Sequence, residues 1–367
     1  MRCHIRYALL VLLANAASGI VPAADAGPLV AAHHGGTWER ADSAPVTELS
    51  VLTYNVKGLP WPVATGRDAA IAAIAERLRE ERARGRQPRI VILQEAFGDT
   101  ARQIADRAGY AYVVLGPDAE QAASFRFVKD LPRDWTRGEA IGKGLDSGLA
   151  VLSDFPIVGT ETMAFGDQAC AGFDCLANKG VLKADIHIPG QARPVQLFNT
   201  HLNARKASGV SVDKANRAFD RQLALVGRFI QSRLDPSSPT IIAGDFNIGQ
   251  DGRRRAAFAG LTASGMLPGY VSLEKTQGVR ALRLGLVPGR DQRDMTAIVR
   301  RSKDLIFSCA MLRPVAASVP FGEEPGEAPL SDHFGYRIDY RLPPLGEGPV
   351  RLAAFTPSRF ESKGRQQ

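Results

Sequence analysis

The sequence lacks several features that would assign a chain to a class at first sight. Its 367 residues contain no internal repeat, which excludes solenoid and propeller architectures. Aromatic residues make up only 7% of the chain, and no strip of aromatic and basic residues is present for stacking on single-stranded nucleic acid. Hydrophobic residues (45%) and charged residues (23%) occur in the proportions of a globular chain, so neither a disordered nor a membrane-embedded protein is expected.

No apolar run reaches the roughly 18 to 20 uninterrupted residues that a membrane span requires. The N-terminal run ALLVLLANAASGIV is interrupted at Asn15, follows two arginines and leads to the small-residue sequence ADA, which ends at Ala26. This order is typical of a secretory signal peptide, with a membrane anchor as the alternative. We therefore predict a secreted protein, periplasmic or extracellular, with a signal peptide over residues 1–26, a flexible leader over 27–46, one domain over 47–343 and a polar tail over 344–367.

Cysteine is scarce, and one of the four cysteines lies in the predicted signal peptide. In an oxidising compartment the closely spaced Cys170 and Cys175 are expected to form a short-loop disulfide. Cys309 then stays single, as a small buried hydrophobic residue. The formal net charge is +8. Arginine runs such as GRRR at residues 252–255 are expected on solvated helix faces or loops, and the charge favours a partner that carries phosphate, either nucleic acid or an anionic membrane surface.

The rest of the sequence switches between strand-like and helical patterns. Apolar residues at helical spacing predict helices over residues 67–85, 100–108 and 213–233. Short apolar or alternating runs predict a larger number of strands, at residues 49–56, 89–95, 148–153, 180–188, 194–202, 240–247, 303–309 and 334–342. Many strands with few helices favour an α/β fold of two packed sheets flanked by helices over one doubly wound parallel sheet.

Polar residues recur at the ends of these predicted strands. Each has an ordinary explanation on its own, as a turn residue, a helix cap or a satisfied core histidine. Their coincidence at so many strand ends favours a common cause, an active-site face shared by the strands. The positions are Asn55, Glu95, His201 with Asn203, Asp245 with Asn247, and Asp332 with His333.

The ordered motifs TYNVKG, QE, SGLAVLS, NTHLNA, GDFN, KDLIF and SDH resemble those of the endonuclease/exonuclease/phosphatase superfamily, over about residues 49–342. The resemblance implies a four-layer α/β/β/α sandwich, in which two mixed β-sheets lie between helical layers, and Mg²⁺-dependent hydrolysis of a phosphoester. It also implies that Asp304 orients the ring of His333, that Asp245 and Asn247 lie beside the attacked phosphate, and that His201 donates to a phosphate oxygen.

The chemistry of phosphodiester hydrolysis accounts for the same residue types. The substrate's negative charge repels a nucleophile, so a hard cation held by oxygen ligands is needed. Glu95 with the amide oxygen of Asn55 fits Mg²⁺, and such a site also accepts Mn²⁺. The attacking water must lose a proton, for which His333 is the candidate base or acid and Asp245 the alternative base. Asp332 is a candidate second metal ligand, with one ion or two as alternatives.

Two stretches narrow the resemblance to secreted bacterial sphingomyelinases. They are NKG at residues 178–180, shortly after Cys175, and NTHLNA. This likeness implies substrate contacts by Asn178, Lys179 and Asn203. It favours a sphingomyelinase-like phospholipase C acting on a phospholipid head group, with no protein partner implied. An extracellular deoxyribonuclease I-like endonuclease is the alternative, favoured by the positive charge, whereas a binding module without catalysis is disfavoured because no motif position is degraded.

One feature of the hemolytic sphingomyelinases, an exposed aromatic hairpin that enters the bilayer, has no counterpart here. The corresponding residues 273–301 contain no Trp, Phe or Tyr. Peripheral membrane contact would then depend on Leu282, Leu284, Leu286 and Val287 with the surrounding arginines. A solvent-exposed linker is the alternative interpretation of this stretch.

Overall fold

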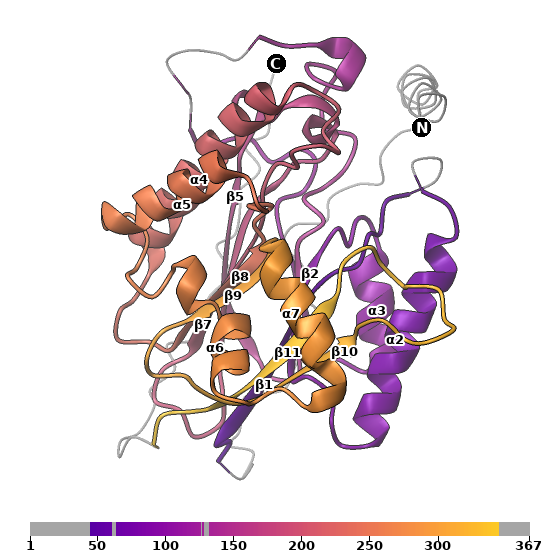
Figure 1. Ribbon diagram of the computed structural model, residues 1–367, viewed down its shortest axis with the longest axis vertical. Helices are drawn as coiled ribbons and strands as arrows, with labels where there is room; N and C mark the ends of the chain where they lie inside the picture. The colour runs from indigo at the N-terminus through magenta and orange to yellow at the C-terminus, as the bar shows by residue number, and fades with distance from the viewer. Residues whose placement is uncertain (1–44, 61–63, 126, 128–131, 345–367) are drawn as a thin grey trace, which may run out of the picture.

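Two β-sheets pack face to face, and helices cover both outer faces (Figure 1). The computed structural model describes residues 45–60, 64–125, 127 and 132–344. The four-layer α/β/β/α prediction is confirmed. The predicted signal peptide and nearly all of the predicted leader and tail lie outside the described residues. Within the described ranges, no helix is both long and apolar enough to span a bilayer.

The first sheet has six strands in the order β10-β11-β1-β2-β4-β3. Strands β1 and β2 run parallel, and the other neighbours pair antiparallel, so the sheet is mixed. The strands are β1 (Glu48–Asn55), β2 (Ile90–Gln94), β3 (Tyr112–Leu115), β4 (Ala150–Ser153), β10 (Arg313–Phe321) and β11 (Gly335–Arg341).

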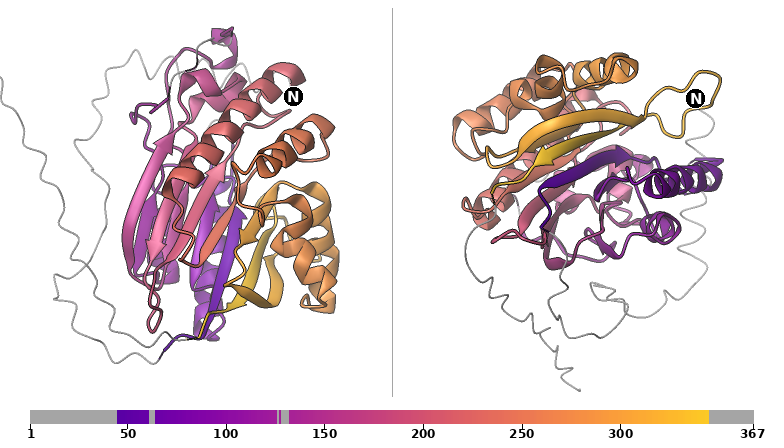
Figure 2. Two further views of the ribbon diagram at one scale, coloured as in Figure 1. Left: turned by 90° about the vertical axis from the view of Figure 1, so that its left-hand side faces the viewer. Right: turned by 90° about the horizontal axis from the view of Figure 1, so that it is seen from below.

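The second sheet has five strands in the order β5-β6-β7-β8-β9. Strands β7 and β8 run parallel, and all other neighbours pair antiparallel. The strands are β5 (Ile157–Ala164), β6 (Gly180–Ile186), β7 (Val195–His201), β8 (Thr240–Asp245) and β9 (Asp304–Ser308). Figure 2 shows the two sheets side by side with the parallel strands near the middle of the molecule.

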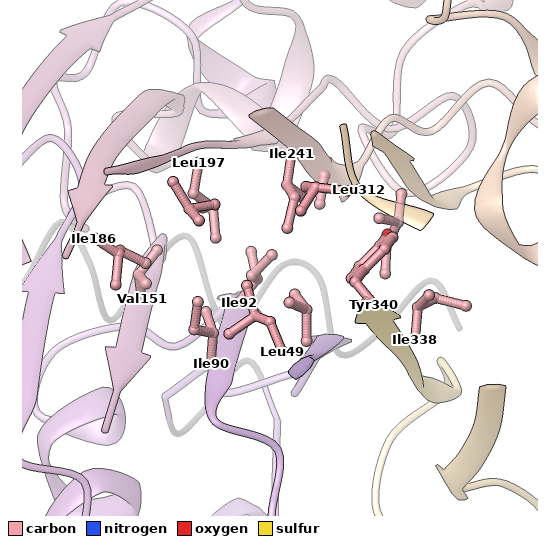
Figure 3. Packing of buried hydrophobic residues seen from close by; sticks show 14 of the residues in the cluster. Leu49, Ile90, Ile92, Val151, Ile186, Leu197, Ile241, Leu312, Ile338 and Tyr340 are labelled. Atoms are coloured by element: carbon pink, nitrogen blue, oxygen red, sulfur yellow. The ribbon is translucent and has the colours of Figure 1, made fainter. Parts of the chain in front are cut away.

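Alternation along the strands builds the layers, because successive side chains of a strand point to opposite faces. In β1, Leu49 and Val51 face the second sheet and join the core between the sheets. Leu52 and Tyr54 face the opposite way and join the cluster beneath the first helical layer. Figure 3 shows Leu49 in the core between the sheets, with Leu197 and Ile241 of the second sheet among the residues across from it.

Helices α2 (Arg67–Ala83) and α3 (Thr100–Ala108) cover the first sheet, and α4 (Val212–Arg233) and α5 (Gly252–Ala263) cover the second (Figure 1). Helices α6 (Gln277–Arg283) and α7 (Gln292–Arg301) contact β9 and β10 instead and close the core at that side. Short 3₁₀ helices complete the elements: η1 (Trp135–Arg137), η2 (Asp167–Ala169), η3 (Gly172–Leu176), η4 (Leu273–Lys275) and η5 (Gly289–Asp291).

Residues 273–301 are neither a membrane hairpin nor a linker, because they form η4, α6, η5 and α7. Leu282 and Leu286 pack against the core between the sheets, and Val287 is buried. Only Leu284 of the four predicted membrane-contact residues is well exposed, at 54%. The prediction that this stretch offers an apolar interfacial surface is therefore wrong.

All eight predicted strands and three predicted helices are present, whereas β3, β5, β10 and helices α5 to α7 were not predicted. The disulfide between Cys170 and Cys175 is formed, and Cys309 is free and buried, as expected. Among the missed elements, α5 carries the GRRR run, whose charge obscured its helical character. Arg254 of this helix reaches the chain beside the candidate site.

Candidate active site

The predicted residues converge at one edge of the two sheets. Four of them end or follow the parallel strands: Asn55 at the end of β1, Glu95 after β2, His201 at the end of β7 and Asp245 at the end of β8. Asp304 opens β9 and His333 precedes β11, so the prediction that His333 and Asp332 follow a strand is wrong. Because β9 and β11 run antiparallel to their neighbours, their starts lie at the same edge as the ends of the parallel strands.

A carboxylate cluster occupies the middle of this edge. The amide nitrogen of Asn55 donates to Glu95 Oε1 at 2.9 Å and to Asp245 Oδ2 at 3.1 Å. The amide oxygen of Asn55 accepts from the backbone N–H of Lys57 at 3.1 Å. The prediction placed this oxygen beside Glu95 as a metal ligand, whereas the structure turns it away. Asn55 here orients the two carboxylates and holds them together.

Glu95 nevertheless has the character of a cation ligand. Burial raises the pKa of Glu95 above its usual value, although the hydrogen bond from Asn55 opposes this. No Lys or Arg among the described residues lies within 4.0 Å of its carboxylate, and the nearest ring nitrogen, His201 Nε2, is at 4.0 Å. A buried carboxylate without a cation is unfavourable. The Glu95 carboxylate therefore has the character of a ligand for a hard divalent ion such as Mg²⁺ or Mn²⁺.

His333 forms a charged pair with Asp304. Its Nδ1 lies 2.8 and 2.9 Å from the two oxygens of Asp304, which fixes the ring, and its Nε2 lies 3.8 Å from Asp245 Oδ2. Burial lowers the pKa of His333, but Asp304 and Asp245 together outweigh burial and raise it to about 9. At neutral pH the ring is therefore an imidazolium whose Nε2–H faces the carboxylate cluster. Ligand atoms of Asp245, Asp304 and His333 all lie within 4.8 Å of one another.

This protonation state predicts a pH dependence of stability. Because the pKa is raised on folding, from the usual 6.5 to about 9, the stabilisation is complete below about pH 6.5 and is lost as the pH rises through 9. In EDTA we expect the free energy of unfolding to fall between pH 6.5 and 9 by up to about 3 kcal/mol more than in His333→Asn. Urea titrations at several pH values measure this difference, and parallel pH curves for the two proteins would contradict it.

His201 is held by Lys179 rather than by a carboxylate. The ammonium of Lys179 lies 3.1 Å from His201 Nε2 and also contacts Asp174 Oδ1 at 2.7 Å and the carbonyl of Leu202 at 3.3 Å. An ammonium only donates, so Nε2 accepts and the ring proton lies on Nδ1, which has no hydrogen-bond partner among the described residues. Burial and Lys179 hold the pKa of His201 well below its usual value. The predicted donation to phosphate is therefore not available from Nε2 in this arrangement.

Asn247 and Glu95 are both held in the left-handed backbone region, with φ of 48° and 54°. Residues other than glycine adopt this region at a cost and often do so at functional sites. The backbone N–H of Asn247 donates to Asp245 Oδ1 at 3.0 Å, and its amide nitrogen donates to the Leu202 carbonyl at 2.9 Å. Among the described residues, the second amide hydrogen of Asn247 has no acceptor.

The comparisons with known proteins agree with this geometry. The model of the Endonuclease/Exonuclease/phosphatase family matches residues 52–343. The chain belongs to this family.

Sphingomyelinases are among the curated relatives of this chain. A sphingomyelinase of Mycobacterium tuberculosis is 24% identical over 233 residues, which are 62% of this chain and 39% of the relative. The chain thus spans about two fifths of the length of the curated relatives it matches. Sphingomyelinase C from Streptomyces griseocarneus has a similar structure, with a TM-score of 0.51, 20% identity, and coverage of 80% of this chain and 99% of that one.

A second similar structure is a beta toxin variant from Staphylococcus aureus with bound magnesium ions. Its TM-score is 0.53 at 16% identity, with 80% of this chain and 99% of that chain covered. At these identities the structural matches establish only the fold, not the activity or the substrate.

Two residues that the sphingomyelinase resemblance assigned to substrate binding are internal to this family member's fold. Asn203 is fully buried, accepts from the backbone N–H of Ala171 and donates to the Ala204 carbonyl. Asn178 is 1% exposed and donates to the carbonyls of Asp118 and Gln121. Their side chains fix neighbouring loops, so the structure corrects the predicted substrate contacts.

Asp332 lies at the rim of the family site. Its side chain is 60% exposed and forms an ion pair with Lys57 at 3.5 Å. Burial raises the pKa of Asp332, but His333 and Lys57 outweigh burial and bring it below its usual value. Its carboxylate is not part of the group that Asp245, Asp304 and His333 form. A role as second metal ligand stays a prediction.

Two site residues were missed from the sequence. Asp174, inside the disulfide-closed loop, accepts from Lys179 and from the backbone N–H of Ala204, and so supports His201 through Lys179. No motif marked it, because an acid in a short cysteine loop has no typical role. The second is Arg254 of the GRRR run, whose predicted place on a solvated surface is wrong.

Proposed function

We propose that the chain is a divalent-metal-dependent phosphodiesterase that cleaves its substrate by attack of water. One observation carries the proposal. Asp304 orients a charged His333, and the carboxylates of Asp245 and Glu95 lie on the other side of the site. A proton donor and a proton acceptor thus face one another across a site that fits a cation. Phosphoester hydrolysis by water requires both, together with charge neutralisation.

The chain's own residues divide the proton transfers between them. Asp245 takes the proton of the attacking water. Two donors, the Asn55 amide and the Asn247 backbone N–H, hold its carboxylate in a fixed orientation. His333 donates its Nε2 proton to the leaving oxygen, since it is already charged at neutral pH. Asn247 has an amide hydrogen free to orient a phosphate oxygen or the water.

A divalent ion held by Glu95 would offset the negative charge of the phosphate during attack. The family relationship supports this requirement. Without the ion, the Glu95 carboxylate, which is 19% exposed, would repel an anionic substrate. This is why we propose Mg²⁺ or Mn²⁺ as the cofactor.

For the substrate we propose a sphingomyelin-like phospholipid, cleaved on the phospholipase C side. The support is the 24% identity to mycobacterial sphingomyelinases and the fold shared with the Streptomyces enzyme. Nucleic acid is the second candidate, supported by the formal charge of +8. We also propose that the protein is secreted after cleavage near Ala26, on the signal-peptide pattern of its sequence.

The test offers the mature protein, from Gly27 on, sphingomyelin vesicles and plasmid DNA in parallel, each with Mg²⁺ or EDTA. We expect Mg²⁺-dependent release of phosphocholine and no nicking of DNA. Nicking without phosphocholine would establish the nuclease alternative. Hydrolysis that is undiminished in EDTA would contradict the metal site.

A vesicle substrate requires a membrane contact, and the structure offers Trp135 in η1. It is 63% exposed and flanked by the exposed Arg133 and Arg137, a combination suited to the interface of an anionic bilayer. The η1 segment adjoins the disulfide loop, because Glu139 accepts from the backbone N–H of Gly172 at 2.6 Å. This loop supports the His201 side of the site.

We expect Trp135→Ala to weaken binding to sphingomyelin vesicles containing phosphatidylserine about tenfold, because burying a large apolar side chain contributes about 1.5 to 3 kcal/mol. Hydrolysis of soluble bis(p-nitrophenyl) phosphate should not change. Vesicle cosedimentation measures the binding. The control is Leu284→Ala, at the exposed leucine that directly follows α6. An equal loss in the two variants, or none in Trp135→Ala, would contradict this membrane contact.

A further inference from the structure

Arg254 is a fully buried cation on α5. Asp251 caps the N-terminus of the helix, and its side chain accepts from the backbone N–H groups of Arg253 and Arg254. The neighbouring Arg253 is 45% exposed and forms ion pairs with Asp213 and Asp220. Two adjacent arginines of one helix therefore have opposite environments, which makes Arg253 a matched control for Arg254.

The Arg254 guanidinium is satisfied by neutral oxygens. Its Nε donates to Asn216 Oδ1 at 2.7 Å, and its Nη1 donates to the backbone carbonyls of Asn203 at 2.9 Å and Asn247 at 2.7 Å. Its Cζ lies 4.5 Å from the centroid of the Phe219 ring. The structure shows no ion pair between Arg254 and any described carboxylate. A buried cation without an anionic partner is costly, so an ordinary core position would not retain it.

The two carbonyls are the informative contacts. Asn203 lies two residues after His201, and Asn247 lies two residues after Asp245. The ladder between β7 and β8 ends at the pair His201 and Asp245. Beyond that pair, a single nitrogen of Arg254 joins the two departing chains, and it does so directly behind the site residues.

Only an arginine has the geometry for this contact. Its planar guanidinium presents several N–H groups in fixed directions, so it can reach Asn216 and both carbonyls at once. Burial lowers the pKa of Arg254 to about 10, so the group keeps its charge at neutral pH. A lysine would place one ammonium in this volume and could not span the same three acceptors.

We propose that Arg254 is a positioning residue, which clamps the chain after β7 to the chain after β8 and thereby sets the separation of His201 from Asp245 and Asn247. This inference rests on the proposed function and deepens it. Arg254 does not touch substrate. It acts through the backbone that carries Asp245 and Asn247, the residues proposed to contact the water and the phosphate. A displacement of about 1 Å in such a site can lower the rate by about 100-fold.

The test compares Arg254→Lys with Arg253→Lys in the mature protein. With bis(p-nitrophenyl) phosphate and Mg²⁺, we expect kcat of Arg254→Lys to fall about 10- to 100-fold while KM stays within about twofold. Amide hydrogen exchange should rise at Leu202 and Asn247, whose N–H groups both donate to Asp245. Arg253→Lys should match the wild type in both measurements.

Exchange does not depend on any substrate, so it tests the clamp even if the proposed activity fails. Unchanged exchange at Leu202 and Asn247 in a folded Arg254→Lys would overturn the inference. So would a loss of kcat that Arg253→Lys shares. If Arg254→Lys does not fold, Asn216→Ala decides, because it removes the acceptor of Nε and should produce smaller changes in the same direction. Wild-type exchange and kcat in Asn216→Ala would then overturn the clamp.

Discussion

Replacing His333 with Asn is expected to lower kcat on an unactivated phosphodiester by about 10²- to 10⁴-fold, the usual contribution of general acid–base catalysis. Asn keeps an N–H donor close to the position of Nδ1, so Asp304 retains a partner. This matters because removing the partner of a buried charge costs about 3 to 5 kcal/mol, and Ala would leave the buried Asp304 carboxylate unpaired. The loss in His333→Asn should therefore reflect the missing Nε2 proton and not unfolding.

The choice of substrate distinguishes an acid from a base. If His333 protonates the leaving oxygen, the loss should be much smaller with bis(p-nitrophenyl) phosphate, because p-nitrophenolate leaves without a proton. Steady-state kinetics on both substrates measure this. Thermal unfolding verifies the fold, and His187→Asn, just after β6, is the control at a histidine outside the site. Equal losses on the two substrates would show that His333 does not act as the acid for the leaving group.

Glu95→Gln is expected to weaken Mg²⁺ binding at least about tenfold. Changes to partners of metal ligands already cost about 10- to 100-fold, and this change removes a ligand charge. The same variant should be more stable than the wild type in EDTA. The reason is that burial disfavours the Glu95 carboxylate, as its raised pKa shows, and Gln has no charge to bury.

Thermal unfolding with and without Mg²⁺ measures both effects at once. Wild type should gain stability with Mg²⁺, by about 2.7 kcal/mol at 100 times the dissociation constant, whereas Glu95→Gln should gain much less. Glu324→Gln, at an exposed carboxylate paired with Arg77, is the control and should behave as wild type. Asp332→Asn tests the predicted second ligand in the same assay. An unchanged Mg²⁺ response in Glu95→Gln would remove Glu95 from the metal site.

The sequence by itself determined the layered fold and the chemical character of the site. Alternation in strands such as β1 requires two buried faces, and this requirement is local to each segment. The polar residues Glu95 and Asp245 could be found because a charged group at the end of a buried strand needs a partner. Both inferences depend only on residue type and spacing.

The tertiary structure alone decided which polar residues meet at the candidate site. Asn203 and Asp174 are both polar residues near the site and outside the strands, yet Asn203 is fully buried while Asp174 supports Lys179. Arg254 belongs to a run that resembles a solvated surface, yet it joins two strands. The direction of a side chain and the identity of its partner depend on segments distant in the chain, and in the carboxylate cluster Asn55 bonds Asp245 across 190 residues. The spacing of residues in the sequence does not predict such contacts, because they form only when the sheets and helices pack.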